Sequence, residues 1–427
     1  AWYGLNHAEV FVLLFACARI GAILLPINWR LSDGEIDQIV ANAEPRIMIH
    51  DAHFAEKAAR FCAHLVGTLQ GRAEEGPQGT EEDPLLLVYT SGSTGLPKGV
   101  VLSQKALIAN AKMSVAAHGL TPDARVFNAL PLFHVGGLNI LPTPAFSIGA
   151  EVVLHERFDP VDMARALQDV THAITVPTVL QSVLATHEWQ TADLSHLHAM
   201  SIGSTDVPVA LIEAVHARGV PLIQVYGATE TAPFAIYQSA EDAMSTVGSI
   251  GRAGSHCEIR LVDGRDVPDG TPGEIWVKGD NVLAEYWRNP DLTAQMLQDG
   301  WFRTGDVAIR QPDGLYYFAD RIKHVIISGG ENIYPAEIER VLRQIPGIRE
   351  VAVVGRTDPK WGEVPVAVVV GDLPRDAVLD PLQGKIARYK QPKDVVFCDA
   401  LPRNAMGKVV AAEVRAMIGA SNPRSRD

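Results

Sequence analysis

Between two short apolar runs, the chain reads YTSGSTGLPKG from Tyr89 to Gly99. Leu85–Val88 precede this stretch and Val100–Leu102 follow it, a pattern that predicts one strand entering and one strand leaving a tight loop. Glycines let the backbone come close to a ligand, and hydroxyls together with free N–H groups can hold phosphate oxygens. Lys98 adds a positive charge. The stretch therefore predicts a phosphate-binding loop in a protein that uses a nucleotide.

Better-known phosphate loops fit this stretch poorly. The Walker loop ends in Gly-Lys-Ser/Thr, whereas Gly99 follows Lys98 here and no hydroxyl residue is placed to hold magnesium. The Gly-x-Gly-x-x-Gly pattern of dinucleotide-binding folds is also absent. A Ser/Gly-rich surface turn would explain the glycines but not the ordered run Ser-Gly-Ser-Thr-Gly-x-Pro-Lys-Gly. These comparisons favour a nucleotide loop of another kind.

Length and composition predict a globular protein of two or three domains. The chain has 427 residues, too many for one hydrophobic core, and 47% of them are apolar. The longest apolar run, Val10–Ala18, is too short to span a bilayer, so we expect no transmembrane segment. The net charge of −13 makes nucleic acid and anionic membranes poor partners.

The cysteines and the first residues indicate the cellular compartment in which the protein is expected. The four cysteines lie far apart and form no Cys-x-x-Cys pair, which argues against a zinc site or a disulfide framework and is typical of the reducing cytoplasm. No secretory signal opens the chain. Because the chain starts at Ala1 without Met and enters a helix-like segment directly, we expect an N-terminal segment to be missing.

Hydrophobic periodicity predicts an α/β protein with two domains. Helices are expected at 8–21, 32–43 and 104–117, with short strands at 21–26 and 46–50, and this βαβ rhythm is typical of a parallel sheet covered by helices. Turn signals between 250 and 277 predict antiparallel hairpins. We expect a large N-terminal domain (1–322) of parallel-sheet α/β subdomains plus a β-rich subdomain, and a small α+β domain (323–427).

The loop and five later motifs resemble the adenylate-forming (ANL) superfamily, which includes acyl-CoA synthetases, luciferases and peptide-synthetase adenylation domains. These motifs follow the loop in the family's order and span nearly the whole chain, which is not compatible with coincidence. They are YGATET at Tyr226–Thr231, WFRTGD at Trp301–Asp306, DRIK at Asp320–Lys323, ISGGENIYP at Ile327–Pro335 and LPRNAMGK at Leu401–Lys408.

The resemblance implies that the chain binds ATP with Mg²⁺, and the residue chemistry agrees. The ring of Tyr226 can stack on adenine, the carboxylate of Asp306 can accept hydrogen bonds from ribose hydroxyls, and Glu230 offers the oxygen ligand that Mg²⁺ prefers. The implied nucleotide-binding residues are Thr90, Ser91, Gly92, Ser93, Thr94, Gly95, Lys98, Gly203, Ser204, Tyr226, Gly227, Asp306 and Arg321.

The resemblance also implies a catalytic lysine, Lys408, on a small domain that rotates about Lys323. Attack of a carboxylate on a phosphate brings two anions together, and a lysine offsets their repulsion, an effect worth on the order of 10² to 10³ in rate. After rotation, the path of coenzyme A would be lined by Gly329, Gly330 and Trp361. The implied catalytic residues are Lys408, Glu230, Thr229 and His134.

The motif LPLFHVGG at Leu130–Gly137 indicates which acid is activated. It resembles the acyl-CoA synthetase form, whereas amino-acid-activating relatives carry an aspartate at the position of His134 to hold the substrate ammonium. The expected pocket also includes Ile202–Thr205, Ile140 and Ala232–Phe234, and none of these residues is charged. Without an arginine for a second carboxylate, an apolar fatty or aryl acid is favoured.

These patterns together predict an acyl-CoA synthetase that forms an acyl-adenylate from ATP and then an acyl-CoA, releasing pyrophosphate and AMP. One alternative is an adenylating enzyme that loads a carrier-protein phosphopantetheine. A non-enzymatic scaffold is the other, although a scaffold has no need of Glu230, Asp306 and Lys408 together. The identity of the acid and the oligomeric state stay open, with a homodimer among the options.

Overall fold

The computed structural model describes residues 1–61, 63–68, 76, 78–90, 97–204, 207–329, 331–383, 385–403 and 409–420. The chain divides into two compact units. Unit 1 comprises Ala1–Arg260, Trp276–Thr304 and Arg310–Tyr317, and unit 2 comprises Leu261–Ile275, Gly305–Ile309 and Phe318–Asp427. The predicted domain division after residue 322 stays a prediction.

A seven-stranded sheet with the order β12-β11-β10-β9-β8-β6-β7 is the centre of unit 1. The strands from β7 to β10 run parallel, as predicted, and β11 and β12 are antiparallel. Their bounds are β6 (Arg125–Asn128), β7 (Glu151–Leu154), β8 (His172–Thr175), β9 (Ala199–Gly203), β10 (Leu222–Tyr226), β11 (Ile236–Tyr237) and β12 (Arg252–Ala253).

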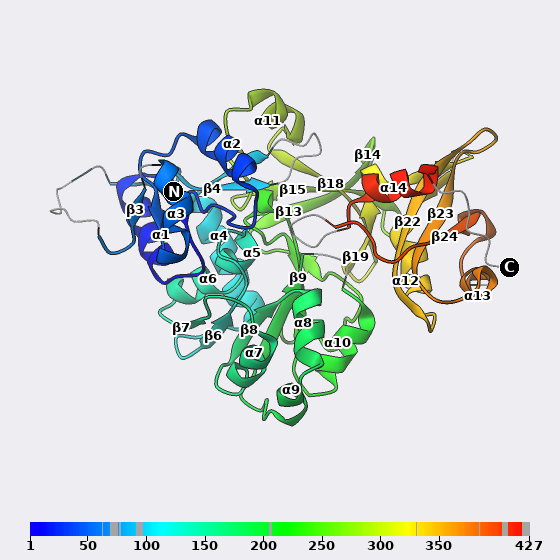
Figure 1. Cartoon of the computed structure of the whole chain (residues 1–427), viewed down its shortest axis with the longest axis horizontal. Coiled ribbons are helices and arrows are strands. Elements are labelled where there is room, and N and C mark those ends of the chain that lie inside the picture. The colour runs from blue at the N-terminus through cyan, green and yellow to red at the C-terminus, as the bar shows by residue number, and fades with distance from the viewer. Residues whose placement is uncertain are drawn as a thin grey trace. The chain divides into compact units, whose positions relative to one another are not determined.

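Both faces of this sheet are covered by helices, because successive strand residues point to opposite sides. Phe127, Met200 and Leu222 pack with α7 (Pro160–Ala166), α8 (Pro177–Leu184), α9 (His187–Thr191) and α10 (Val209–His216), which gather beside the sheet in Figure 1. Their neighbours Val126, Ala199 and Ile223 pack instead with α4 (Gln104–His118) and α6 (Pro142–Ser147). Helix α4 is therefore buried against the sheet.

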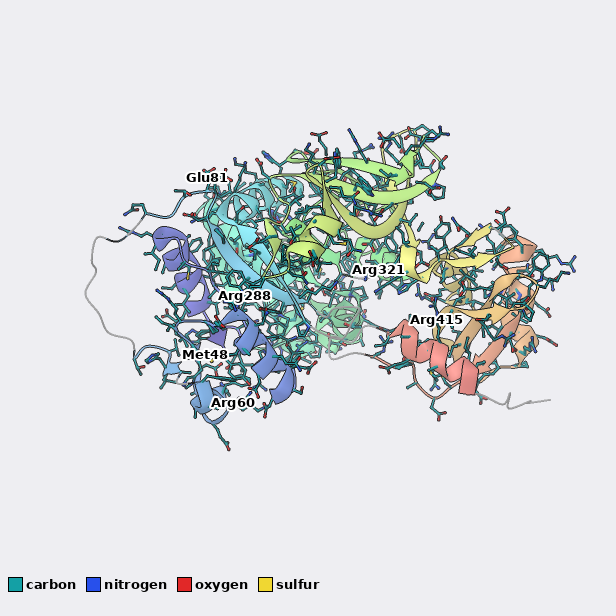
Figure 2. All side chains as sticks on the ribbon, turned by 90° about the horizontal axis from the view of Figure 1, so that it is seen from above. Met48, Arg60, Glu81, Arg288, Arg321 and Arg415 are labelled. Atoms are coloured by element: carbon teal, nitrogen blue, oxygen red, sulfur yellow. The ribbon has the colours of Figure 1, made fainter. Side chains whose placement is uncertain are left out.

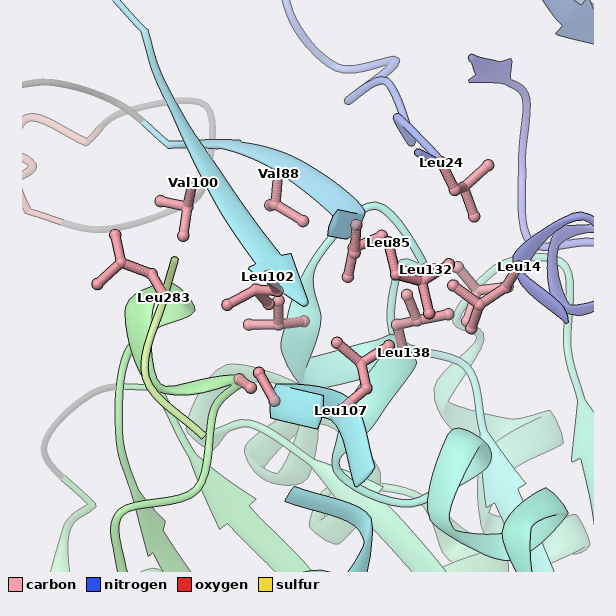
Figure 3. Close-up of a cluster of buried hydrophobic side chains, with 14 of the residues drawn as sticks. Leu14, Leu24, Leu85, Val88, Val100, Leu102, Leu107, Leu132, Leu138 and Leu283 are labelled. Carbon is pink, nitrogen blue, oxygen red and sulfur yellow. The ribbon is translucent and has the colours of Figure 1, made fainter. Parts of the chain in front are cut away.

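The strands predicted around the phosphate loop form an antiparallel hairpin, β4 (Pro84–Thr90) and β5 (Lys98–Ser103). The short strand β16 (Glu285–Tyr286) pairs with β5. Figure 3 shows the apolar side of the hairpin packed against Leu107 of α4 and against Leu283. Ser103 ends β5 and also caps α4, since its hydroxyl accepts a hydrogen bond from the Ala106 N–H at 3.2 Å. The predicted helix at 104–117 is confirmed.

The N-terminal segment follows the predicted helices but not both predicted strands. Helix α1 (Glu9–Ile20) ends at Gly21, and α2 (Asp33–Ala43) begins with a Ser32–Glu35 capping box. The strand predicted at 21–26 is wrong: this segment makes only isolated bridges, because Pro26 has no N–H with which to extend a ladder. The strand predicted at 46–50 is shorter than expected and covers only β2 (Ile49–His50). It lies between the parallel strands β1 (Trp2–Tyr3) and β3 (His64–Leu65).

The predicted antiparallel hairpins are confirmed in a six-stranded sheet. Its order is β14-β13-β15-β18-β17, with β19 paired to β18. The bounds are β13 (Cys257–Asp263), β14 (Arg265–Asp266), β15 (Pro272–Gly279), β17 (Leu297–Gln298), β18 (Trp301–Arg310) and β19 (Tyr316–Arg321). Helix α11 (Pro290–Met296) precedes β17.

Unit 2 contains a sheet of order β21-β20-β23-β22, with β24 paired to β23. Successive strand residues again point to opposite sides, so this sheet has two apolar faces. Val353 and Val369 pack with α12, and Val354 and Val368 pack with α14. The bounds are β20 (Ile326–Ser328), β21 (Glu331–Ile333), β22 (Ile348–Asp358), β23 (Gly362–Gly371), β24 (Asp394–Phe397), α12 (Pro335–Leu342), α13 (Arg375–Leu379) and α14 (Ala411–Ala420). Among the described residues, no helix has both the length and the apolar character needed to cross a membrane.

Candidate active site

The hairpin β4–β5 holds the two ends of the predicted phosphate loop together. Thr90, the last residue of β4, pairs with Lys98, the first residue of β5. Both side chains are half-buried. Ser91, Gly92, Ser93, Thr94 and Gly95 were also predicted to bind phosphate, and they lie outside the described residues. The hairpin therefore confirms the strands on each side of the loop, and the phosphate-binding roles stay predictions.

Gly203 and Tyr226 lie at the carboxyl ends of neighbouring parallel strands, β9 and β10, where Gly203 pairs with Val225. This edge is where ligands bind in open α/β sheets. A Cβ on Gly203 would lie 2.5 Å from the Val225 carbonyl oxygen, so only glycine fits. Ser204 follows with φ +78°, a conformation that is uncommon for residues other than glycine and is concentrated at functional sites. Thr205 lies outside the described residues.

The segment Tyr226–Phe234 folds into a tight turn after β10. A Cβ on Gly227 would lie 1.6 Å from the Pro233 carbonyl oxygen, so the two ends of the turn touch. The Ala228 N–H donates to the Thr231 hydroxyl at 2.9 Å, which closes the short helix η3 (Thr229–Thr231). The turn presents Thr229 and Glu230 next to the strand that ends in Tyr226.

Glu230 is held from two directions by the segment around β16. Its carboxylate accepts a hydrogen bond from the Tyr286 hydroxyl at 2.8 Å, and its backbone carbonyl accepts one from the Leu283 N–H at 2.8 Å. Tyr286 is 3% exposed. Burial, and then the charge of Glu230, raise the pKa of the Tyr286 hydroxyl, so this group stays a donor at every physiological pH.

In unit 2 the carboxylate of Asp306 forms an ion pair with the Arg321 guanidinium at 3.0 Å. Asp306 is buried, whereas the Arg321 side chain, labelled in Figure 2, is about half exposed. Gly305, before Asp306, has φ +71° and donates its N–H to Glu274 at 3.1 Å. The structure thus brings together the two residues predicted to bind ribose.

Two residues predicted to line the coenzyme A path also meet in unit 2. Gly329 sits between β20 and β21 with φ +61° and donates its N–H to the Trp361 carbonyl at 2.7 Å. A Cβ on Gly329 would lie 2.9 Å from the Trp361 ring, which is 45% exposed. Lys323 is exposed in η4 (Ile322–His324). Gly330 and Lys408 lie outside the described residues.

The acid-pocket motif folds as a turn that leads into α5 (Val135–Asn139), and His134 is the residue before this helix. The His134 ring lies against Phe133, with ring centroids 4.5 Å apart. A Cβ on Gly137 would lie 2.3 Å from the Pro131 carbonyl oxygen, so the turn requires glycine there. His134 is half-buried.

Three residues that organise these segments had no role predicted from the sequence. Tyr286 holds Glu230, Asp320 accepts the Ala336 N–H at 2.8 Å in the first turn of α12, and Asn110 holds Phe234. One signal was available for Asn110: Asn110, Ser114 and His118 recur four apart along α4, which predicts a polar stripe on one face of the helix. No local pattern reveals Tyr286, because its partner lies elsewhere in the sequence.

A cavity of about 590 Å³ lies elsewhere in unit 1, between α1, α4 and α6. Its lining is mostly apolar and includes Leu14, Phe15, Leu107 and Ile108. None of the predicted site residues lines this cavity, so it is not part of the predicted active site.

Two family models match the chain. One, described as AMP-binding enzyme, matches residues 1–287, and the other, described as AMP-binding enzyme C-terminal domain, matches residues 337–408. An indoleacetate–CoA ligase from Aromatoleum aromaticum is 46% identical over 447 aligned residues, covering 98% of this chain and 88% of the relative. A feruloyl-CoA synthase from an Amycolatopsis species is 39% identical, with coverage of 98% and 88%.

A solved structure similar to this one is the o-succinylbenzoate CoA synthetase of Bacillus subtilis in complex with an acyl-adenylate intermediate. Its TM-score is 0.87 at 33% identity, and the match covers 97% of this chain and 87% of that chain. The same enzyme in complex with ATP and magnesium ion matches with a TM-score of 0.86 at 31% identity, covering 96% and 88%. These matches confirm the predicted fold class.

Proposed function

The chain belongs to the family of AMP-binding enzymes, and from that premise we propose that it is an aryl-CoA ligase. It is an AMP-forming acid–thiol ligase that uses ATP, Mg²⁺ and coenzyme A. The observation that carries the proposal is the 46% identity to an indoleacetate–CoA ligase over 98% of this chain. The further step to aromatic acids as the substrate class is supported by that relative and by the lining of the acid pocket.

The reaction has two steps. First, a carboxylate oxygen of the acid attacks the α-phosphorus of ATP, and the bond to the pyrophosphate oxygen breaks, which gives an acyl-adenylate and pyrophosphate. Second, the sulfur of coenzyme A attacks the acyl carbonyl carbon, the thiol proton is lost, and the bond to AMP breaks. The products are the acyl-CoA and AMP.

The residues of unit 1 bind ATP in this proposal. Tyr226 offers its ring to adenine, and Gly203 leaves space at the strand edge beside it. Thr90 and Lys98 stand where the phosphate loop leaves and rejoins the hairpin, and we expect Lys98 to attract the phosphates as a positive charge. The carboxyl edge of the parallel sheet supports these roles, since nucleotides bind there in this class of fold.

Unit 1 fits Mg²⁺ through its donor chemistry. This ion takes oxygen ligands and is commonly held by one or two carboxylates together with substrate phosphates. Glu230 supplies such a carboxylate, and in the described part of the chain no group of three or more His, Cys, Asp or Glu offers a self-contained metal site. When bound, the ion would neutralise charge on the phosphates. Tyr286 orients the Glu230 carboxylate through its hydrogen bond.

The residues of unit 2 serve both steps in this proposal. Asp306 accepts hydrogen bonds from the ribose hydroxyls, with Arg321 holding the carboxylate in place. Lys408 offsets the repulsion between the acid and the α-phosphate in the first step. Gly329 and Trp361 line the path of coenzyme A in the second step, after rotation about Lys323.

We infer an aromatic rather than a long aliphatic acid from two observations. Both curated relatives described above act on aromatic acids by name, indoleacetate and ferulate. The described residues of the acid-pocket motifs carry no charge, and they include the half-buried ring of His134. Flat aromatic walls favour an aromatic ligand, because rings gain from stacked and edge-on contacts.

A panel of acids tests this proposal. Purified protein would be incubated with MgATP, coenzyme A and one acid at a time, and release of AMP would be measured. We expect kcat/KM for indole-3-acetate or ferulate to exceed that for octanoate or palmitate by at least about tenfold, the effect of a few well-placed contacts. Equal or greater efficiency with the aliphatic acids would overturn the aryl assignment.

Replacing free coenzyme A by a holo carrier protein in the same assay tests the acceptor. We expect thioester formation with free coenzyme A. A thioester formed only on the carrier protein would favour the alternative of a carrier-loading enzyme.

A further inference from the structure

Helix α4 has a polar stripe on its buried face. Asn110, Ser114 and His118 lie four residues apart, so their side chains project from the same side of the helix. They are 1%, 0% and 2% exposed. Burying three polar side chains costs free energy unless each finds a hydrogen-bond partner. All three do, and their partners lie in three separate segments.

Asn110 joins two of these segments. Its amide nitrogen donates to the Asn139 carbonyl at the end of α5 at 2.7 Å, and its amide oxygen accepts the Phe234 N–H at 3.2 Å. The carbonyl of Phe234 accepts a further hydrogen bond from the buried Asn281 side chain. The backbone of Phe234 is therefore held on both sides by buried asparagines.

Ser114 and His118 extend the stripe to the sheet. The Ser114 hydroxyl donates to the Ile140 carbonyl, just after α5. The His118 ring accepts a hydrogen bond at Nε2 from the Ser201 hydroxyl in β9, because its Nδ1 must donate to the Ser114 carbonyl at 2.8 Å. The same ring meets the Phe234 ring edge-on, with centroids 5.9 Å apart. Burial lowers the pKa of His118 to about 3, which keeps the ring neutral.

The three segments that the stripe holds are those that carry the predicted acid pocket. The first runs from His134 through α5 to Ile140, the second ends at Phe234, and the third is β9, where Ser201 lies two residues before Gly203. The helix itself begins at Ser103, the last residue of the strand that leaves the phosphate loop. One rigid element thus connects the loop hairpin to each pocket wall.

We propose that Asn110, Ser114 and His118 are positioning residues that set the shape of the acid pocket and thereby the selectivity among acids. The proposal rests on the proposed function. A displacement of about 1 Å far from the reacting atoms can cost about 100-fold in rate. Loss of one of these hydrogen bonds should therefore change how acids bind, while the ATP-binding residues keep their places.

The experiment compares Asn110→Leu and Ser114→Ala with Leu107→Met, a control in the same helix that is buried, packs in the hairpin core and loses no hydrogen bond. We expect Asn110→Leu to lower kcat/KM for the preferred aryl acid by about 10- to 100-fold, to change the ratio between two acids, and to leave the KM for ATP nearly unchanged. Ser114→Ala should act in the same direction with a smaller effect. An equal loss with every acid, or a matching rise in the KM for ATP, would overturn the proposal.

Amide hydrogen exchange provides a readout that does not depend on activity. Exchange of the peptide around Phe234, followed by mass spectrometry, should be faster in Asn110→Leu than in wild type and unchanged in Leu107→Met. Unchanged exchange in Asn110→Leu would overturn the positioning role. If none of the acids tested leads the wild type to release AMP, the proposed function fails. The exchange result still decides whether Asn110 holds Phe234.

Discussion

Glu230 shows how single residues prepare this site. A carboxylate that holds a metal works best when a neighbour fixes its orientation, and such outer partners matter nearly as much as the ligands themselves. The Tyr286 hydroxyl takes that place, at 2.8 Å from the Glu230 carboxylate. Strand β16 also pairs with β5, which leaves the phosphate loop. The same short strand thus touches both the residue proposed to hold Mg²⁺ and the loop hairpin.

Tyr286→Phe removes this hydrogen bond with little change in volume. We expect the Mg²⁺ concentration for half-maximal ATP–pyrophosphate exchange to rise about 10-fold, within the usual range for loss of an outer partner. Calorimetric titration with MgATP, without acid, should show weaker binding as well. Tyr3→Phe is the matched control, because the Tyr3 hydroxyl is buried and has no hydrogen-bond partner in the described part of the chain. Equal behaviour of the two variants would contradict the role of Tyr286.

Gly227 gives a second prediction at this scale. Because its Cβ would lie 1.6 Å from the Pro233 carbonyl oxygen, Gly227→Ala must push the turn apart, at a cost of about 1–3 kcal/mol for overpacking. We expect a lower thermal midpoint and a loss of adenylate formation. Gly34→Ala in α2 is the control, since no atom lies within 4 Å of the added Cβ. A Gly227→Ala enzyme with wild-type stability and activity would show that the turn is not rigid.

At the scale of elements, the buried polar stripe of α4 makes the folding stability of the protein depend on pH. Burial lowers the pKa of His118 to about 3 and that of His172, which donates to the His118 carbonyl at 3.0 Å, to about 4. Both histidines have a pKa near 6.5 in an unfolded chain. The unfolded state therefore binds more protons below about pH 6.5, and stability must fall as pH decreases from there towards the folded pKa values.

Thermal unfolding between pH 7.5 and 4.5 tests this dependence. We expect the midpoint of the wild type to fall steadily below about pH 6.5, the unfolded pKa of histidine. His118→Gln should start from a lower midpoint at pH 7.5 but show a shallower fall, because one buried neutral imidazole is gone. His187→Gln, at an exposed position on α9, is the control. An identical pH slope in His118→Gln and wild type would contradict the buried neutral state.

Elements whose signals are local could be predicted from the sequence, and those that depend on distant partners could not. The helices predicted at 8–21 and 32–43 are confirmed because their ends have local signals, a glycine after α1 and a capping box at Ser32, and the hairpin around the loop followed from its flanking apolar runs. The strand predicted at 21–26 failed because Pro26 has no N–H with which to extend a ladder, so the segment makes only isolated bridges at Leu24 and Pro26. Within the site, motif residues such as Tyr226 and Asp306 were identified by their resemblance to a family. Tyr286 and Asn110 act on residues 56 and 124 positions away, which no local pattern encodes.

At the scale of the whole molecule, the proposed reaction draws on residues of both units. Unit 1 carries the loop hairpin, Tyr226, Glu230 and the acid-pocket segments, and unit 2 carries Asp306, Arg321, Gly329 and Trp361. The proposal assigns the two chemical steps to different parts of unit 2, Lys408 for the first and the Gly329 hairpin for the second. Such use of one small domain for two steps requires a hinge motion.

Lys408→Ala separates the two steps. We expect formation of the acyl-adenylate to fall by about 100- to 1,000-fold, the usual effect of losing a charge-stabilising group. Formation of the thioester from chemically prepared acyl-adenylate and coenzyme A should stay near the wild-type rate. Equal loss in both half-reactions would contradict the assignment of Lys408 to the first step alone.

The most direct test of the central claim is isotope exchange between labelled pyrophosphate and ATP in the wild-type protein, without coenzyme A. If the chain forms an aryl-adenylate, exchange must require both Mg²⁺ and an aryl acid such as indole-3-acetate, and later addition of coenzyme A must release AMP and the aryl-CoA. Exchange that is independent of any acid, or turnover that releases ADP and phosphate instead of AMP and pyrophosphate, would contradict the assignment.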